Sequence, residues 1–547
     1  MKNLLYLAAS TLTAFVHAAD TPPIVGLWMM GQSLCDGSES LPVVSTEGSK
    51  WGNRMFELGV RTWLAKDNSA TPEKRADDSF RLVPLRATVN GGLGETIANG
   101  MADHLQAARE AKDASVYLVA CAGQGGRQIQ ELSSADLSVD ERTPESRRHG
   151  GGYYKTSLDD ARRAKALRPD FRIEALYWMQ GEGNGGPTGG IVPARWEAEL
   201  PRPKGLAWYR DQLMAYRRQW SADLCAMTGQ SGELPMFTYQ TLGPAGEAQL
   251  MAADADESIH LVGPHYAVPS ALNSLYPPGR HGDAIHLAAD GERWWGEQVG
   301  KVMHRVLYQN EAWQPLRPRH ASLDAARAAV VVEFIVPRPP LVIDTHFLAR
   351  QEIAAEGGFT SLAGFQVRTG DGKAHPLTAV EIASPTSVRL RLAKALSKEE
   401  SCRISYGHPF AGALSSVIEI RQGTGEFEEL VLEGLLANRL KPLTDEGAFF
   451  VTTPSSTNTR VPIRRVREES GYTLLGYEPR ELRDGKSFKV GQPLMAQRSF
   501  SYGNLRDSDP EKSVYTFADT RYGTRAGQAY PLWNWCVLFS DFEVQTR

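Results

Sequence analysis

Short apolar runs alternate with segments of helical periodicity through the first 305 residues, and this alternation constrains the fold more than any other feature. Five runs rich in β-branched and aromatic residues predict strands over 24–30, 116–120, 173–179, 236–240 and 260–262. Apolar residues at helical spacing lie between them, as at Ile97, Met101 and Leu105, and a last helix is predicted over 293–307. Continuously apolar strands separated by helices are typical of a mostly parallel sheet covered on both faces. The sequence therefore predicts an α/β domain.

The pattern changes after a segment at 313–320, which carries two prolines and few apolar residues and predicts a linker. Beyond it, apolar and polar residues alternate along short runs at 330–336, 365–368, 388–392 and 402–406. Turns containing Gly, Pro and Asp separate these runs. Alternation with a period of two predicts half-buried antiparallel strands, and several of them in succession predict a β-sandwich.

The N-terminal residues have the pattern of a cleavable export signal. Lys2 precedes an apolar run from residue 4 to 16, and the small residues Ala18 and Ala19 follow it. A membrane anchor is the alternative, but the run is too short to span a bilayer comfortably. We therefore expect residues 1–19 to be removed as a signal peptide. The mature protein is expected to be periplasmic or secreted, with no membrane insertion.

Charge and cysteine content exclude several classes of function. The chain has 60 Lys and Arg against 64 Asp and Glu, a net charge of −4 with no long run of one sign, which argues against a nucleic-acid or anionic-membrane partner. Five cysteines spread over 547 residues do not form a disulfide framework, and at most two bridges can form. Dinucleotide loops, P-loops and the Gly-x-Ser-x-Gly and His-Glu-x-x-His motifs are missing from the sequence, so no cofactor or metal is expected.

A serine directly follows the first predicted strand, in the sequence Gly31-Gln32-Ser33. Open α/β sheets bind their ligands at the carboxyl ends of strands. A glycine-flanked turn at this place exposes the serine hydroxyl and can direct a backbone N–H toward an oxyanion. The ordinary alternative is a serine that caps a helix.

Two further polar elements can carry chemistry. Asp283 and His286 lie three residues apart ahead of the last predicted helix, so the carboxylate can fix the imidazole tautomer while the other ring nitrogen faces a nucleophile. Gln180 follows the strand predicted at 173–179, where a side-chain amide can donate to an oxyanion. Each element alone is also compatible with an ordinary polar loop.

In this order and at these separations, the three elements resemble the SGNH (GDSL-like) hydrolase superfamily, specifically its carbohydrate O-acetylesterases of the sialate O-acetylesterase type. The resembling residues are Gly31-Gln32-Ser33, the stretch Trp-Met-Gln-Gly-Glu at 178–182, and Asp283-Ala-Ile-His286. The resemblance covers residues 24 to 305 and implies a flavodoxin-like three-layer SGNH catalytic domain at 20–312. The chain departs from the family pattern at Leu34, where relatives usually have Asn, and at Gly183, where they usually have Ser.

The resemblance also implies a role for each matching residue. Ser33 would be the nucleophile, His286 the general base and then the general acid, and Asp283 the partner that orients the imidazole. The chemistry would proceed through an acetyl-enzyme that water hydrolyses. Activity is then expected to fall as the pH is lowered through about 6.5, the ordinary pKa of histidine.

The same resemblance implies an oxyanion hole and a substrate pocket. The backbone N–H of Ser33, the side chain of Gln180 and Gly94 would line the oxyanion hole, with Gly91 and Gly92 as alternatives to Gly94. The stretch from Cys121 to Arg127 resembles the family's Gly-Gly loop. The residues expected to line the substrate pocket are Gln32, Glu182, Gly126 and Arg127.

The C-terminal region also looks similar to the accessory β-domain of this family, in which a tyrosine-bearing strand is followed closely by an Asn-Leu loop. Here Tyr406 and Asn504 are separated by about ninety residues, roughly the length of one small domain. We therefore expect an accessory β-sandwich formed by 313–411 and 501–547, with an inserted module at 412–500.

These features together predict an exported serine esterase that removes O-acetyl groups from a carbohydrate, either sialic acid or a plant cell-wall polysaccharide or oligosaccharide. Two alternatives stay open. A GDSL-type hydrolase of lipids or simple esters would prefer longer acyl chains. A catalytically inactive glycan-binding protein would bind sugar without turnover.

Overall fold

The computed structural model describes most of the chain. The described residues are 22–63, 75, 77–90, 92–109, 115–134, 152–184, 205–243, 245–269, 285–348, 350–407, 411–434, 449–453, 456–482, 487–498, 502–518 and 525–545. The predicted signal peptide lies outside them, so export stays a prediction. Among the described residues, no helix combines the length and the apolar character needed to cross a membrane.

A seven-stranded sheet with the strand order β3-β2-β4-β1-β5-β6-β7 forms the centre of the N-terminal half. Its strands are β1 (Ile24–Gly31), β2 (Arg54–Phe56), β3 (Leu82–Pro84), β4 (Val116–Cys121), β5 (Arg172–Met179), β6 (Met236–Gln240) and β7 (Ile259–Pro264). Every neighbouring pair is parallel except β2 with β3. All eight residues of β1 are buried, as its continuous apolar run requires in a sheet covered on both faces. The predicted α/β class with a parallel sheet is confirmed.

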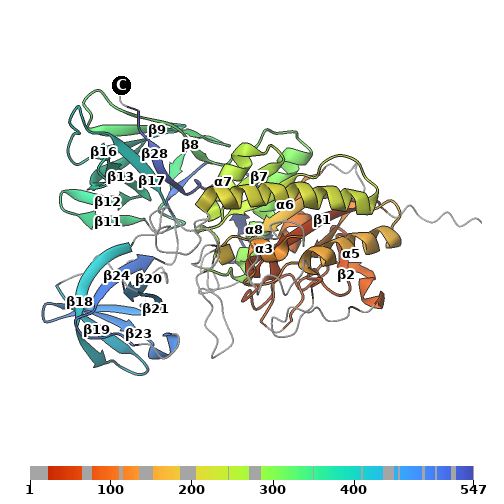
Figure 1. Ribbon diagram of the computed structural model, residues 1–547, viewed down its shortest axis with the longest axis horizontal. Helices are drawn as coiled ribbons and strands as arrows, with labels where there is room; N and C mark the ends of the chain where they lie inside the picture. Colours follow the sequence, from red (N-terminus) through yellow and green to blue (C-terminus); the bar gives the residue numbers. More distant parts are fainter. Residues whose placement is uncertain are drawn as a thin grey trace, which may run out of the picture.

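Helices cover both faces of this sheet (Figure 1). The side chains of Val25, Leu27 and Met29 share one core with α2 (Ala98–Ala108) and α8 (Ala289–Leu307). The alternate residues Trp28 and Met30 share the opposite core with three other helices. These are α5 (Gly152–Leu167), α6 (Gly205–Thr228) and α7 (Ala245–Ala255). Successive side chains of β1 therefore point into two different cores, one on each face of the sheet. The sheet and the helices on its two faces form three layers.

Glycines allow α2 and α8 to pack with their backbones in contact. A Cβ atom added at Gly100 would lie 2.0 Å from the carbonyl oxygen of Arg293, and one at Gly296 would lie 2.2 Å from that of Ile97. Real side chains cannot occupy such positions, so the close packing requires glycine at both sites. The seam fixes the start of α8, and with it the residues just before that helix.

The C-terminal half consists of antiparallel sheets, which occupy the other side of the molecule in Figure 1. A ten-stranded sheet contains β8 (Arg317–Leu323), β9 (Ala329–Ile335), β11 (Glu352–Ala355), β12 (Gly358–Leu362), β13 (Phe365–Thr369), β14 (Ala374–His375), β15 (Leu377–Ser384), β16 (Ser387–Leu392), β17 (Cys402–Tyr406) and β28 (Phe539–Glu543). Two short pairs join β10 (Val342–Ile343) to β25 (Leu505–Arg506) and β26 (Lys512–Thr516) to β27 (Ala529–Pro531). Large antiparallel sheets agree with the β-rich C-terminal half that the alternation predicts.

A separate seven-stranded sheet spans 411–498, close to the interval 412–500 predicted to be inserted. Its strands are β18 (Ala411–Gln422), β19 (Glu428–Glu433), β20 (Phe449–Thr453), β21 (Ser456–Pro462), β22 (Arg465–Glu469), β23 (Tyr472–Tyr477) and β24 (Pro493–Arg498). Its core includes Val417, Leu430, Leu475 and Leu494. The exact domain limits stay a prediction.

The segment expected to be a linker is packed against the sheet instead. Trp313 is buried and donates its indole N–H to the carbonyl oxygen of Leu261 at 2.9 Å, and Leu316 is completely buried. The strand β8 already begins at Arg317, and Pro318 is tolerated because β8 lies at the edge of its sheet. The linker prediction was therefore wrong, because the buried side chains of Trp313 and Leu316 hold the segment against the protein despite its two prolines.

The C-terminal segment returns to the N-terminal half and packs on α2 and α8. The ammonium group of Lys301 is fully buried, lies 3.0 Å from Asp509, and donates to the side chain of Asn534 at 2.9 Å. The imidazole of His104 lies between Glu297, at 2.9 Å, and Glu511, at 3.0 Å. Buried charges that are paired in this way hold the two segments in one arrangement.

Candidate active site

Ser33 is the first residue of α1 (Ser33–Asp36), the short helix that follows β1. The backbone N–H of Gln32 donates to the carbonyl oxygen of Met179 at 3.0 Å, so the turn is fixed to the end of β5. A Cβ atom at Gly31 would lie only 2.2 Å from that same oxygen, which explains why glycine precedes the turn. Ser33 is 8% exposed and stands at the carboxyl edge of the sheet.

The carboxylate of Asp36 fixes the neighbouring loop beside this serine. It accepts hydrogen bonds from the backbone N–H of Gly125 at 2.7 Å and from the hydroxyl of Ser38 at 2.7 Å. A Cβ atom added at Gly125 would lie 3.4 Å from Ser33 Cβ, so this loop packs directly on the serine. Burial raises the pKa of Asp36 to about 6, against the opposing effects of the Ser38 hydrogen bond and the Arg61 charge.

His286 precedes α8 and lies at the same edge. Its Nδ1 atom is 3.6 Å from the carboxylate of Glu39, a residue with a left-handed backbone (φ 63°). The imidazole is also among the groups that lower the pKa of Asp36, which places it within electrostatic reach of the Ser33 turn. Asp283, the predicted orienting partner, lies outside the described residues.

Both the nitrogen and the oxygen of the side-chain amide of Gln180, the predicted oxyanion residue, are hydrogen-bonded within the protein. Its Nε2 donates to the side chains of Gln32, at 3.2 Å, and Asn184, at 2.8 Å, and to the carbonyl oxygen of Arg127, at 3.1 Å. Its Oε1 accepts from the hydroxyl of Tyr209 at 2.8 Å. Gln180 therefore ties together the loops after β1, β4 and β5.

The glycine-rich segment supports the turn that carries Glu39. The backbone N–H of Gly94 donates to the carbonyl oxygen of Gly37 at 2.8 Å, and the carbonyl oxygen of Gly92 accepts from the N–H of Glu39 at 2.9 Å. A Cβ atom at Gly94 would lie 2.3 Å from the carbonyl oxygen of Ser40. Gly91 lies outside the described residues. The close approach itself requires glycine at position 94.

The predicted pocket residues surround the same edge. Glu182 accepts hydrogen bonds from the hydroxyls of Tyr239, at 2.6 Å, and Thr241. Arg127 forms an ion pair with Glu131 at 3.0 Å. Gly126 is exposed with φ 73°, and a Cβ atom there would meet nothing within 4 Å. Gln32 is almost completely buried, and its Oε1 accepts from the N–H of Gly183 at 2.9 Å.

Sequence reasoning missed three buried carboxyl groups in this region. Burial, reinforced by the nearby carboxyls of Glu95 and Asp36, raises the pKa of Glu292 well above its usual value. Burial also raises the pKa of Glu95, whose carboxylate accepts from the backbone of Val44 and Ser45. The one signal for Asp36 in the sequence is its position three residues after Ser33 on a helical turn.

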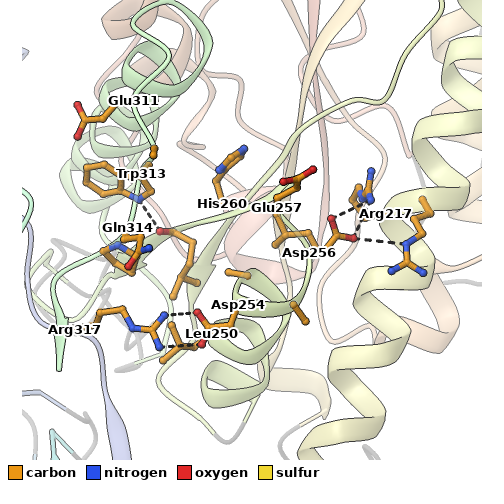
Figure 2. A pocket seen from close by; sticks show the side chains of 17 residues that line it. Arg217, Leu250, Asp254, Asp256, Glu257, His260, Glu311, Trp313, Gln314 and Arg317 are labelled. Atoms are coloured by element: carbon orange, nitrogen blue, oxygen red, sulfur yellow. Dashed lines mark hydrogen bonds and ion pairs between the residues drawn. The ribbon is translucent and has the colours of Figure 1, made fainter. Parts of the chain in front are cut away.

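A cavity of about 680 Å³ lies far from these residues, at the amino end of β7 (Figure 2). Several charged groups that line it are paired with each other, as in Arg217 with Asp256 at 2.8 Å and Arg317 with Asp254 at 2.9 Å. The candidate site residues and this cavity therefore occupy opposite edges of the sheet. Among the described residues, no group of three or more His, Cys, Asp or Glu side chains is arranged to hold a metal ion.

Comparison with known proteins gives distant likenesses. No family model and no curated protein sequence matches the chain. A carbohydrate acetylesterase from Xanthomonas citri is similar in structure at 16% identity and a TM-score of 0.45, over 70% of this chain and 75% of that one. NanS is similar at 15% identity and a TM-score of 0.36, over 53% and 99%. A protein from Arabidopsis thaliana is similar at 13% identity and a TM-score of 0.32, over 52% and 100%. At such identities and TM-scores, these likenesses decide neither the family nor the activity of this chain.

Proposed function

We propose that this protein is a serine esterase that removes O-acetyl groups from a carbohydrate. The observation that carries the proposal is the position of Ser33 at the carboxyl end of the central strand, packed against a loop that Asp36 holds, at the same edge as His286. A serine hydroxyl and an imidazole at the ligand-binding edge of a parallel sheet suit acyl transfer.

In the proposed mechanism, Ser33 attacks the acetyl carbonyl while His286 takes the hydroxyl proton. His286 then donates this proton to the departing sugar oxygen, and it activates water to hydrolyse the acetyl-enzyme. Asp283 is the proposed orienting carboxylate, and Glu39 is a second carboxylate at Nδ1 of the imidazole. Either of them favours the protonated imidazole that forms during the reaction.

The oxyanion is proposed to bind the backbone N–H of Ser33, at the start of α1. Gln180 and Gly94 already donate to protein acceptors in the free enzyme. Each would have to give up a hydrogen bond before it could serve the oxyanion.

The carbohydrate substrate follows from the sequence resemblance, with sialic acid and plant cell-wall glycans as the candidates. Gln32, Glu182, Gly126 and Arg127 are proposed to lie along its path. The N-terminal pattern supports export to the periplasm or the medium, where such glycans occur.

The test is acetate release from a panel of acetylated glycans and from 4-nitrophenyl acetate. Wild type is compared with Ser33→Ala and with the control Ser397→Ala, which changes an exposed serine ahead of β17. We expect release to be lost in the first variant and kept in the second. Preference for long-chain esters would instead support the lipid hydrolase, and sugar binding without any release would support the inactive binding protein.

A further inference from the structure

Two buried cysteines lie in contact directly beneath the candidate active site. The Sγ atoms of Cys35 and Cys121 are 3.4 Å apart, and neither residue is accessible to solvent. Cys121 Sγ also lies 3.9 Å from the carbonyl oxygen of Cys35. The two thiols therefore face each other at the end of the core.

The two cysteines belong to the two segments that meet at Ser33. Cys35 is in α1, two residues after the serine, and Cys121 is the last residue of β4, ahead of the loop that packs on the serine. A Cβ atom at Gly123 would lie 2.2 Å from the carbonyl oxygen of Gly31, so that loop and the end of β1 are in backbone contact. A bond between the thiols would join the two segments without bringing distant parts together.

We propose that Cys35 and Cys121 form a disulfide bond that links the nucleophile turn to the loop after β4. The sulfur atoms need to approach by about 1.4 Å to reach the bonded distance of about 2.0 Å. The other three cysteines, Cys225, Cys402 and Cys536, make no thiol–thiol contact in the described part of the chain. The bond would close a loop of 86 positions and would restrict the unfolded chain accordingly.

The reaction needs an oxidant, for which we name a small disulfide such as glutathione disulfide. One cysteine thiolate attacks it, forms a mixed disulfide and releases one glutathione thiolate. The second cysteine thiolate then displaces the second glutathione. In total, two protein thiols become one disulfide, and their two electrons and two protons appear in two molecules of glutathione.

The environment indicates when this exchange takes place. Burial raises the pKa of the Cys35 thiol well above its usual value, and the thiolate is the reactive form. The bond is therefore expected to form while the chain folds, before this core closes. Folding in an oxidising compartment provides that condition.

The test counts free thiols in residues 20–547, the chain without its predicted signal peptide. The reduced protein is refolded in a glutathione redox buffer, denatured with excess N-ethylmaleimide and weighed by mass spectrometry. We expect three adducts before chemical reduction and five after it. We also expect a linked pair of tryptic peptides, one ending at Lys50 and one spanning 113–127, at 2 Da below the summed mass of the two thiol peptides. Five adducts without reduction, or a link between other cysteines, would overturn the proposal.

Two serine variants give opposite changes in the same count. Cys35→Ser releases Cys121 and is expected to raise the number of adducts from three to four. Cys402→Ser, in the core of the ten-stranded sheet, is expected to lower it from three to two and to keep the linked peptides. An unchanged count of three in Cys35→Ser would contradict the pairing. The wild-type count needs no variant to fold and does not depend on the esterase activity.

Discussion

The carboxylate of Asp36 accepts a hydrogen bond of 2.7 Å from the backbone N–H of Gly125, a residue 89 positions further along the chain. This bond joins the turn that carries the candidate nucleophile to the loop that packs against it. The ionised carboxylate accepts from Ser38 and from Gly125 at the same time. The ionisation state of Asp36 therefore affects how the loop packs beside Ser33.

Acidification is expected to weaken the site through Asp36 as well as through His286. The pKa of Asp36 is raised to about 6 by burial, and a protonated carboxyl can no longer accept hydrogen bonds on both oxygens. Two groups then lose activity as the pH falls. A plot of log kcat/KM against pH is expected to reach a slope of two below pH 6 in the wild type and of one in Asp36→Asn. Equal slopes in both proteins would remove Asp36 from the pH dependence.

Asp36→Asn is also expected to lower kcat/KM at pH 8 by tenfold or more, because an amide has one acceptor oxygen for two sets of donors. Steady-state hydrolysis of 4-nitrophenyl acetate measures this. Asp211→Asn, on the exposed side of α6, is the matched control and is expected to change it by less than twofold.

The stability of the fold is expected to change with pH in the opposite sense to activity. Because the folded-state pKa of Asp36 lies above its ordinary value of 3.8, ionising it opposes folding. This cost is absent below about pH 4 and complete above about pH 6, where it amounts to about 3 kcal/mol. Relative to wild type, Asp36→Asn is expected to be more stable at pH 7.5 than at pH 4 by this amount. Urea unfolding at the two pH values checks the difference.

His104 is expected to change the stability with pH in the same sense as Asp36, although it stabilises the fold where Asp36 opposes folding. Burial alone would lower its pKa, but the hydrogen bonds to Glu297 and Glu511 outweigh this effect and raise it. The stabilisation is therefore complete below the ordinary histidine pKa and is lost as the pH rises through the folded-state value. His104→Ala is expected to cost about 3 kcal/mol at pH 6 and less at pH 9. His375→Ala, near the protein surface, serves as the control in thermal unfolding at both pH values.

Two glycines, one in the loop after β4 and one outside the candidate site, provide a matched pair. Gly123→Ala places a methyl group 2.2 Å from the carbonyl oxygen of Gly31, so the loop must move and activity is expected to fall at least tenfold. Gly229→Ala, just after α6, meets no atom and is expected to cost only about 1 kcal/mol of stability for its left-handed backbone, with activity kept. If both variants retain activity, the loop does not position the serine.

The variant Gln180→Glu distinguishes a structural role of Gln180 from a purely catalytic one. The new oxygen would face three acceptors that the amide now satisfies, on Gln32, Asn184 and Arg127. We expect a lower unfolding temperature together with at least a tenfold loss of activity. The exposed change Gln309→Glu should leave both unchanged. A loss of activity with an unchanged unfolding temperature would instead favour a direct oxyanion role.

The sequence patterns predicted the strands of the parallel sheet better than they predicted the polar residues at the carboxyl ends of those strands. All five predicted strands are present, because continuous apolar runs report burial on both faces. The three-residue strands β2 and β3 were missed, since so short a run shows no periodicity. Ser33, Gln180 and His286 were proposed as site residues from their places next to predicted strands and helices, and their roles stay predictions. Asp36 and Glu39 were not, because their significance depends on partners brought close only by the tertiary fold.

The burial of Lys301 against Asp509 has a consequence for the order in which the protein is completed. The helix that fixes the position of His286 carries a fully buried ammonium group whose partner lies 208 residues later in the chain. During synthesis, the first 312 residues emerge long before this counter-charge exists, and an uncompensated buried cation is strongly unfavourable. The N-terminal half is therefore expected to reach its final form only when the last forty residues dock. Active protein should not be obtainable by truncation after the parallel sheet, even though that half contains every candidate catalytic residue.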